Sequence, residues 1–291
     1  MQKQTYEKLR QLHPCFGKET GKTGRIHLPV SPCCNLACRY CSRTLTESEE
    51  RPGTARGILP VEKVPEILEK ALELCPGLTT VGIAGPGEAL ASPHAIQAFT
   101  QVEKDFPQMV KCLSTNGLLL PEKAQELAAV HVDAVTVTVN SVDPAVQMRI
   151  NKGIRYHDAW IEGEEAAAIL IRNQTDGIRR ASNLGITVKV NIVLIPGIND
   201  SEIETTAKTA ADAGAKICNI IPLIPQADMA GLRAPSCSEV ESARKKALSH
   251  LDVFYHCRHC RADAAGILGG EDIGKLLYES RYLDAETFSH G

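Results

Sequence analysis

The sequence is poor in aromatic residues and contains no apolar run long enough to cross a bilayer. Aromatic side chains make up 4% of its 291 residues, with a single tryptophan. A net charge of −3 and a pI near 6.3 exclude the strongly basic surface typical of nucleic-acid and membrane-surface binders. Residues 1–4 do not open a signal peptide. We therefore expect a cytoplasmic protein that has neither nucleic acid nor membrane as a partner.

Cysteine, in contrast, is abundant. The eleven cysteines are odd in number and cluster at metal-like spacings, so bound metal explains them better than a disulfide scaffold. Cys34, Cys38 and Cys41 form a Cys-x3-Cys-x2-Cys run, with Tyr40 just before the last cysteine. Three thiolates at this spacing can bind three corners of a [4Fe-4S] cluster and leave its fourth iron open. The run resembles the signature of the radical SAM superfamily, in which S-adenosylmethionine (SAM) binds that iron and is cleaved to a 5′-deoxyadenosyl radical.

A structural zinc site is the alternative for this loop, with Cys33 as its fourth ligand. Two adjacent cysteines would strain a tetrahedral shell, and zinc sites usually pair two knuckles that lie a dozen or more residues apart. The iron–sulfur cluster is therefore the preferred interpretation. Cys33 is then interpreted as a small buried side chain.

Strand and helix patterns alternate along most of the chain. The predicted strands cover residues 25–31, 79–84, 110–114, 133–139, 186–194 and 216–221. The predicted helices cover residues 61–74, 93–105, 121–129, a stretch that begins near 143–144, 164–184, a stretch that ends at 213, and 238–250. This alternation predicts an α/β fold with a parallel sheet, a partial (β/α)6 TIM-like barrel of the radical SAM type. We expect a single domain, with an N-terminal extension over 1–24, the partial barrel over 25–250 and a cluster-binding tail over 251–291.

Polar residues follow several predicted strands, at the end of the barrel where active sites lie. The turn at residues 85–88 is rich in glycine, which lets the backbone approach a ligand closely. Radical SAM enzymes hold the amino group of SAM at a turn in this position. The candidates for SAM contact are Tyr40, Gly85, Gly87, Glu88, Ser114, Asn116, Asn140, Ser141 and Asn191. Serine and asparagine also favour caps and turns, so a structural role stays open for them.

The tail carries a second metal-like element, the pair Cys257 and Cys260. A zinc knuckle completed by His256 or His259 is the alternative here. Taken as a set, six stretches closely resemble the NifB family of nitrogenase cofactor maturases, which are radical SAM enzymes. They are residues 13–16, 34–41, 51–53, 81–87, 112–117 and 257–264.

This resemblance implies a reaction. Members fuse two [4Fe-4S] substrate clusters, K1 and K2, add a ninth sulfur and insert a SAM-derived carbide, which gives the eight-iron core called NifB-co. One SAM donates a methyl group to a cluster sulfide, and a second yields the radical. Beyond the triad, the implied iron ligands are Cys15, His27, Cys112, Cys257 and Cys260.

The five implied ligands are fewer than two cubanes could accept, as expected of substrate clusters that must fuse and leave. We assign Cys257, Cys260 and Cys15 to one cluster and His27 with Cys112 to the other, while Cys15 fits either. Three further cysteines match no motif and are interpreted as structural. They are Cys75, Cys218 and Cys237.

The resemblance also implies partners: iron–sulfur donor proteins, an electron donor such as ferredoxin or flavodoxin, and a carrier or scaffold that receives NifB-co. Many bacterial members continue into a NifX-like domain, for which this chain ends too early, so we expect the stand-alone form common in archaea. Two alternatives stay open. One is a radical SAM enzyme with an auxiliary cluster that acts on an organic substrate, and the other is a non-catalytic iron–sulfur scaffold, which would not cleave SAM.

Overall fold

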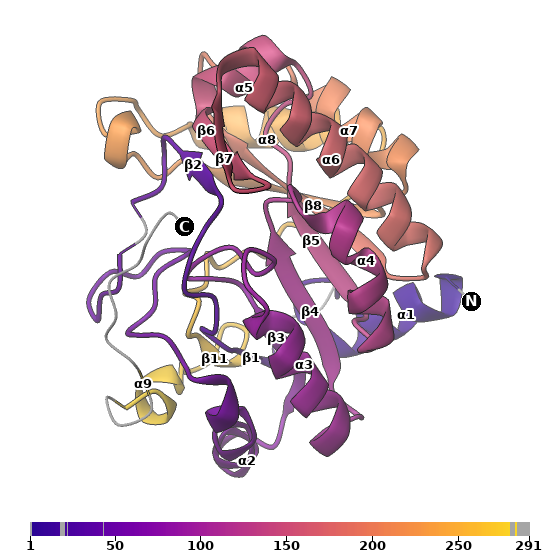
Figure 1. Ribbon diagram of the computed structural model, residues 1–291, viewed down its shortest axis with the longest axis vertical. Helices are drawn as coiled ribbons and strands as arrows, with labels where there is room; N and C mark the ends of the chain where they lie inside the picture. Colours follow the sequence, from indigo (N-terminus) through magenta and orange to yellow (C-terminus); the bar gives the residue numbers. More distant parts are fainter. Residues whose placement is uncertain (1, 18–20, 22, 43, 280–282, 284–291) are drawn as a thin grey trace.

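One twisted sheet of eight strands forms the centre of the molecule (Figure 1). The computed structural model describes residues 2–17, 21, 23–42, 44–279 and 283. The strand order is β10-β9-β8-β5-β4-β3-β1-β11, and every neighbouring pair is parallel except β1 with β11. Within the described residues the two edge strands do not pair with each other, so the barrel is open on one side. The predicted partial barrel is confirmed.

The elements follow the predicted alternation. The strands of the large sheet are β1 (Gly24–His27), β3 (Leu78–Ile83), β4 (Val110–Thr115), β5 (Ala134–Thr138), β8 (Thr187–Leu194), β9 (Ile217–Pro222), β10 (Asp252–Val253) and β11 (Ala265–Ile267). The helices are α1 (Gln2–Leu12), α2 (Val64–Leu74), α3 (His94–Asp105), α4 (Leu120–Ala129), α5 (Pro144–Ile150), α6 (Gly163–Asn183), α7 (Ile203–Ala213), α8 (Cys237–Leu248) and α9 (Gly274–Leu277), with 3-10 turns at Val61–Lys63 and Ala227–Met229.

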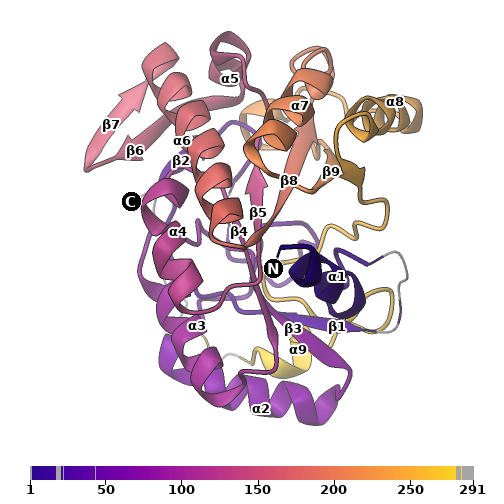
Figure 2. The ribbon, with the colours of Figure 1, turned by 90° about the vertical axis from the view of Figure 1, so that its right-hand side faces the viewer.

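Local sequence explains most of these elements. In β8, Val188, Val190 and Ile192 are fully buried against the outer helices, and the residues between them face the interior of the barrel. Figure 2 shows α3, α4, α6 and α7 following one another along the outside of the sheet. None of the described helices is both long and apolar enough to cross a membrane.

Two local predictions can be compared directly. Helix α5 begins where expected, because the carboxylate of Asp143 accepts hydrogen bonds from the amides of Ala145 and Val146. Strand β1 is shorter than predicted and ends at His27 instead of residue 31. Pro29 has no amide hydrogen to donate to a neighbouring strand, which explains the early end.

A second, three-stranded sheet was not predicted. It consists of β2 (Leu36–Cys38), β6 (Asn151–Tyr156) and β7 (Ala159–Glu162) in the order β2-β6-β7. Strands β6 and β7 form a hairpin, and β6 pairs antiparallel with β2, which lies inside the cysteine loop. This sheet ties the loop at residues 34–41 to the end of helix α5.

The N-terminal segment up to Phe16 and residues 254–268 of the tail together close the amino-terminal end of the barrel. A buried cluster joins Leu9 of α1 and Phe16 to Val110 and Ile217, which lie at the starts of β4 and β9. Phe254 and Leu268 from the tail complete this cluster. Strand β11 adds to the free edge of β1, so the tail lies beside the first barrel strand (Figure 1).

Candidate active site

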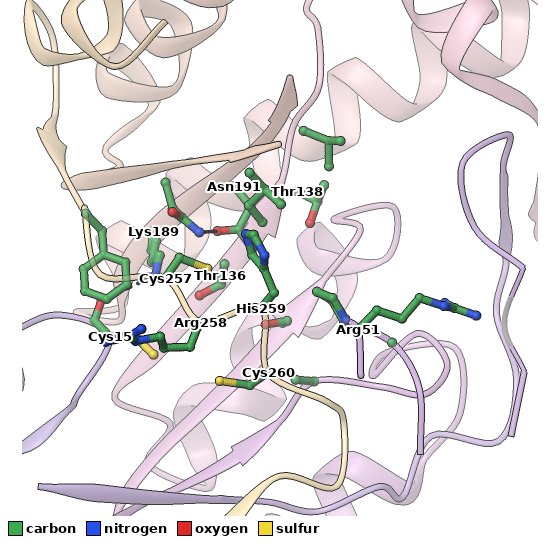
Figure 3. A pocket seen from close by; sticks show the side chains of 18 of the residues that line it. Cys15, Arg51, Thr136, Thr138, Lys189, Asn191, Cys257, Arg258, His259 and Cys260 are labelled. Carbon is green, nitrogen blue, oxygen red and sulfur yellow. Dashed lines mark hydrogen bonds between the residues drawn. The ribbon is translucent and has the colours of Figure 1, made fainter. Parts of the chain in front are cut away.

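A cavity of about 300 Å³ lies inside the barrel and extends from the cysteine loop towards the closed amino-terminal end. Side chains from six parallel strands and from the tail line it, and Figure 3 shows them converging from these separate elements. All five implied iron ligands beyond the triad line this one cavity. They are Cys15, His27, Cys112, Cys257 and Cys260.

His27 and Cys112 lie on either side of Gly82. The three residues are in register across β1, β3 and β4. A Cβ placed on Gly82 would lie 2.9 Å from Cδ2 and 3.4 Å from Nε2 of His27, and 3.3 Å from Sγ of Cys112. The glycine therefore leaves open the space between an imidazole and a thiol, which is what a shared ligand at these two side chains requires.

The imidazole of His27 has the tautomer and the neutral charge that metal binding requires. Its Nδ1 lies 2.9 Å from the carbonyl oxygen of Arg261, which can only accept, so Nδ1 carries the hydrogen and Nε2 keeps a free lone pair. Burial, with a further contribution from Arg25, lowers the pKa of His27 to about 4. The ring is thus neutral near neutral pH, which is the form that binds metal.

Cys15 lies near both groups of ligands. Burial raises the pKa of its thiol, and Cys260 and Cys257 raise it further. The same thiol raises the pKa of Cys112, although burial is the larger cause there. Cys15 is therefore close to both the tail pair and Cys112, and this placement is compatible with either assignment.

Cys260 has a cationic neighbour. Nη2 of Arg25 donates to its Sγ at 3.0 Å, and Nη1 donates to the carbonyl oxygen of Gly266 at 2.9 Å. Because Arg25 belongs to β1 and Gly266 to β11, these bonds hold the tail pair against the first barrel strand.

A smaller cavity of about 140 Å³ lies at the carboxyl ends of the strands. Cys38 and Cys41 line it from the loop, and six of the predicted SAM contacts line it too. Those six are Tyr40, Gly87, Glu88, Ser114, Asn116 and Asn140. The two cavities share a wall formed by Tyr40, Cys41, Ala84, Ser114 and Thr138.

Other predicted residues lie elsewhere. Cys34 is almost fully buried, and its Sγ lies 3.5 Å from the carbonyl oxygen of Leu36. Asn191 lines the larger cavity, where its Oδ1 accepts from Nδ2 of Asn219 at 3.2 Å. Gly85 and Ser141 line neither cavity, and Ser141 accepts a hydrogen bond from the amide of Asp143. Their roles as SAM contacts stay predictions.

Glu88 connects neighbouring turns. Its carboxylate accepts hydrogen bonds from the hydroxyl of Thr115, from the amide of Asn116 at 2.6 Å and from the amide of Leu90 at 3.1 Å. Nδ2 of Asn116 in turn donates to Oδ1 of Asn35 in the cysteine loop at 2.7 Å. The chain from Glu88 to Asn35 fixes the loop over the smaller cavity.

Three residues of the smaller cavity were missed from the sequence. Oε1 of Gln147, Oε1 of Gln174 and both amide atoms of Asn151 are buried without a hydrogen-bond partner. Unpaired buried polar atoms are costly, so they indicate a polar ligand. Gln147 lies in α5, and Asn151 follows the last residue of that helix as the first residue of β6. Nothing in the local sequence marks these residues as part of a site.

The zinc alternatives gain no support. Among the described residues, no three histidine, cysteine, aspartate or glutamate side chains lie close enough together to bind a single metal ion. A structural zinc site would need four such ligands in tetrahedral geometry. A cubane can accept thiolates that lie further apart, because they bind different irons.

Known proteins resemble the chain in sequence and in fold. Residues 28–210 match the model of the radical SAM superfamily. Two relatives are named FeMo cofactor biosynthesis protein NifB. The protein of Methanocaldococcus infernus is 38% identical over 297 residues, which cover 98% of each chain. That of Methanocaldococcus jannaschii is 41% identical over 290 residues, which cover 97% of this chain and 96% of the relative.

The solved structure of SuiB from Streptococcus suis has a similar fold, with a TM-score of 0.57 at 12% identity over 86% of this chain and 52% of that chain. At this identity the likeness concerns the fold alone. The near-complete coverage by relatives and the superfamily match settle the family. The chain belongs to the NifB family of radical SAM enzymes.

Proposed function

We propose that this enzyme fuses two [4Fe-4S] substrate clusters, with a SAM-derived carbide and an added sulfur, into NifB-co, the eight-iron precursor of the nitrogenase cofactor. Membership of the NifB family supports a role in the biosynthesis of that cofactor. The arrangement of residues inside the barrel supports the finer chemistry.

Cys34, Cys38 and Cys41 would hold the resident [4Fe-4S] cluster, and the smaller cavity would hold SAM. The fit rests on the three thiols of one loop and on the unpaired amide atoms of Gln147, Asn151 and Gln174. When bound there, the two groups together supply a methyl group and a 5′-deoxyadenosyl radical. The residues around them position these groups. Nδ2 of Asn140 donates to the hydroxyl of Tyr40 at 3.0 Å, which fixes the end of the cysteine loop to the end of β5.

The shared wall of the two cavities is the observation that carries the proposal. Tyr40 and Cys41 belong to this wall and face both spaces, so a molecule in the smaller cavity would lie close to the larger one. The larger cavity offers thiols and an imidazole, which bind iron.

We assign the proposed iron ligands of the larger cavity to two substrate clusters. The open space beside Gly82 supports a shared cluster for His27 and Cys112. Cys257 and Cys260 lie on one short tail segment and would bind the other cluster, with Cys15 near both groups of ligands. Such sparse ligation leaves irons free to form new bonds during fusion. The partners proposed for this cycle are an iron–sulfur donor protein, a ferredoxin or flavodoxin and a carrier of NifB-co.

Product analysis tests the function. The protein is reconstituted anaerobically with iron and sulfide, reduced and incubated with SAM, and we expect both S-adenosylhomocysteine and 5′-deoxyadenosine. Cys257→Ala or Cys260→Ala should abolish S-adenosylhomocysteine, because the cluster that receives the methyl group would be lost. Cys237→Ala is the matched control, since this exposed cysteine on α8 lines neither cavity.

Two other results of this product analysis would favour a different function. Formation of 5′-deoxyadenosine without S-adenosylhomocysteine in the parent enzyme would favour an organic substrate. A fully loaded protein that forms neither product would be an iron–sulfur scaffold.

Asn151→Leu should weaken SAM binding while stabilising the free protein. Loss of one good hydrogen bond, about 1.4 kcal/mol, raises the dissociation constant about tenfold. In the absence of SAM, removal of the unpaired amide should raise the free energy of unfolding by about 1 kcal/mol. Titration calorimetry with SAM and urea unfolding measure the two effects. Asn183→Leu, on the exposed end of α6, is the control and should change neither. Unchanged SAM affinity in Asn151→Leu would place SAM elsewhere.

A further inference from the structure

A buried lysine faces the cysteines inside the barrel. Lys189 belongs to β8, its side chain is shielded from solvent, and it lines the larger cavity together with Cys15, Cys112 and Cys257. Figure 3 shows it among the side chains that surround this space. Neither the sequence motifs nor the family resemblance assigns it a role.

Its contacts are those of a cation without a counter-ion. Nζ lies 3.4 Å from the carbonyl oxygen of Cys15 and 4.4 Å and 5.7 Å from the ring centres of Phe254 and Phe16. Among the described residues, no carboxylate lies within the 4.0 Å of an ion pair. Aromatic faces and one distant carbonyl offset the burial of a charge only in part.

Two other buried cations of the barrel are paired with carboxylates. Nζ of Lys111, on the neighbouring strand β4, lies 2.7 Å from the carboxylate of Glu103. Nε of Arg261 lies 2.8 Å from the carboxylate of Asp263. Arg25 on β1 is buried as well, and among the described residues it pairs with no carboxylate; it donates to Sγ of Cys260 and to the carbonyl oxygen of Gly266. Lys189 and Arg25, the described buried cations without a carboxylate, thus both lie beside cysteines of the cavity.

The charge of Lys189 affects the pKa values of the Cys15 and Cys112 thiols. Burial raises the pKa values of Cys15 and Cys112, and Lys189 opposes that rise at both. His13 lines the same cavity. Its Nδ1 accepts from the amide of Cys15 at 3.1 Å, so its buried Nε2 carries the hydrogen, and this atom has no partner. A cation and an unused donor thus flank Cys15, and both favour an anion.

We propose that Lys189 is the counter-ion of the anionic substrate cluster bound beside Cys15, and that it sets the reduction potential of that cluster. The inference rests on the proposed function, because thiolate-ligated iron–sulfur clusters are the anions that the cavity would receive. A positive charge next to a cluster stabilises its reduced, more negative state over its oxidised state.

The test separates the cavity clusters from the resident one. In a parent with Cys34→Ser, Cys38→Ser and Cys41→Ser, reconstituted iron reports on the larger cavity alone. Potentiometric titration followed by electron paramagnetic resonance then compares Lys189→Met with Lys189→Arg in this parent. Lys189→Met should shift the one-electron equilibrium about tenfold towards the oxidised state, about 59 mV. Lys189→Arg keeps the charge and should stay close to the parent.

Stability of the metal-free protein distinguishes a counter-ion from a structural lysine. Removal of an unpaired buried charge should leave metal-free Lys189→Met at least as resistant to urea as the parent. An unchanged cluster potential in a fully loaded Lys189→Met protein would overturn the proposal. If the metal-free Lys189→Met protein were also markedly destabilised, the lysine would have a structural role instead. Absence of iron from the cavity of the triad-free parent would instead overturn the proposed function, and the role of Lys189 with it.

Discussion

Replacing Gly82 by valine is expected to remove one substrate cluster from the enzyme. Valine suits a strand, and Gly82 does not occupy the left-handed region, so β3 should keep its backbone. Its Cβ would nevertheless lie 2.9 Å from Cδ2 of His27, closer than real contacts allow. The ring cannot simply rotate away, because its Nδ1 is bonded to the carbonyl oxygen of Arg261. The added side chain therefore fills the space between the imidazole and Cys112.

Iron content measures this loss. In the reconstituted Gly82→Val enzyme we expect the four irons of one cluster to be missing. 5′-Deoxyadenosine should still form at the resident cluster. S-adenosylhomocysteine should still form as well, because its formation depends on the cluster at the tail pair. Gly82→Ala should give an intermediate loss. Gly231→Val is the control, because a Cβ there meets no atom within 4 Å. Full iron content in Gly82→Val would show that His27 and Cys112 do not share a cluster.

Asp263→Ala should lower the free energy of unfolding by about 3–5 kcal/mol, because it breaks a buried ion-pair network. The carboxylate is fully buried and accepts from the amide and Nη1 of Arg56, at 2.8 Å and 2.7 Å, and from Nε of Arg261 at 2.8 Å. Arg261 is itself buried, and Nη2 also donates to the carbonyl oxygen of Thr46 at 2.8 Å. Its charge would remain inside the protein without compensation.

Urea unfolding of the metal-free protein, followed by circular dichroism, measures this effect. Asp212→Ala is the matched control, since its exposed carboxylate pairs with Lys208, four residues earlier on α7, and should contribute less than about 0.5 kcal/mol. Equal losses in the two variants would mean that the network around Asp263 contributes no more than a surface pair. Because Arg261 follows Cys260 directly, iron binding at the tail pair should weaken as well.

Sequence patterns predicted the barrel well because its elements form from local signals. The apolar alternation in 187–194 and the cap at Asp143 need no knowledge of distant residues. Strands β2, β6 and β11 were missed because they are short, and β2 and β11 form only by pairing with remote segments. Leu36 pairs with Ile154, and Ile26 pairs with Ala265. Such pairings leave almost no local trace.

In the candidate site, too, some features follow from local sequence and others only from the folded structure. Spacing alone predicted the triad and the tail pair as iron ligands, since these cysteines lie close together in the chain. The alternation of β8 already places Lys189 on the same face as Asn191, but only the fold reveals that no carboxylate of the described residues pairs with it. The unpaired amide of Asn151 and the space beside Gly82 are likewise properties of packing.

The pairing of β11 with β1 has a consequence for the order of events during synthesis. The chain leaves the ribosome from its amino terminus, so Cys15, His27 and Cys112 emerge long before Cys257 and Cys260. Until Ala265–Ile267 arrive, one edge of β1 stays unpaired and open to other chains. The proposed ligand set of the cavity is therefore complete only after Cys260 has been made, and the proposed substrate clusters would meet all of their ligands only from that point on.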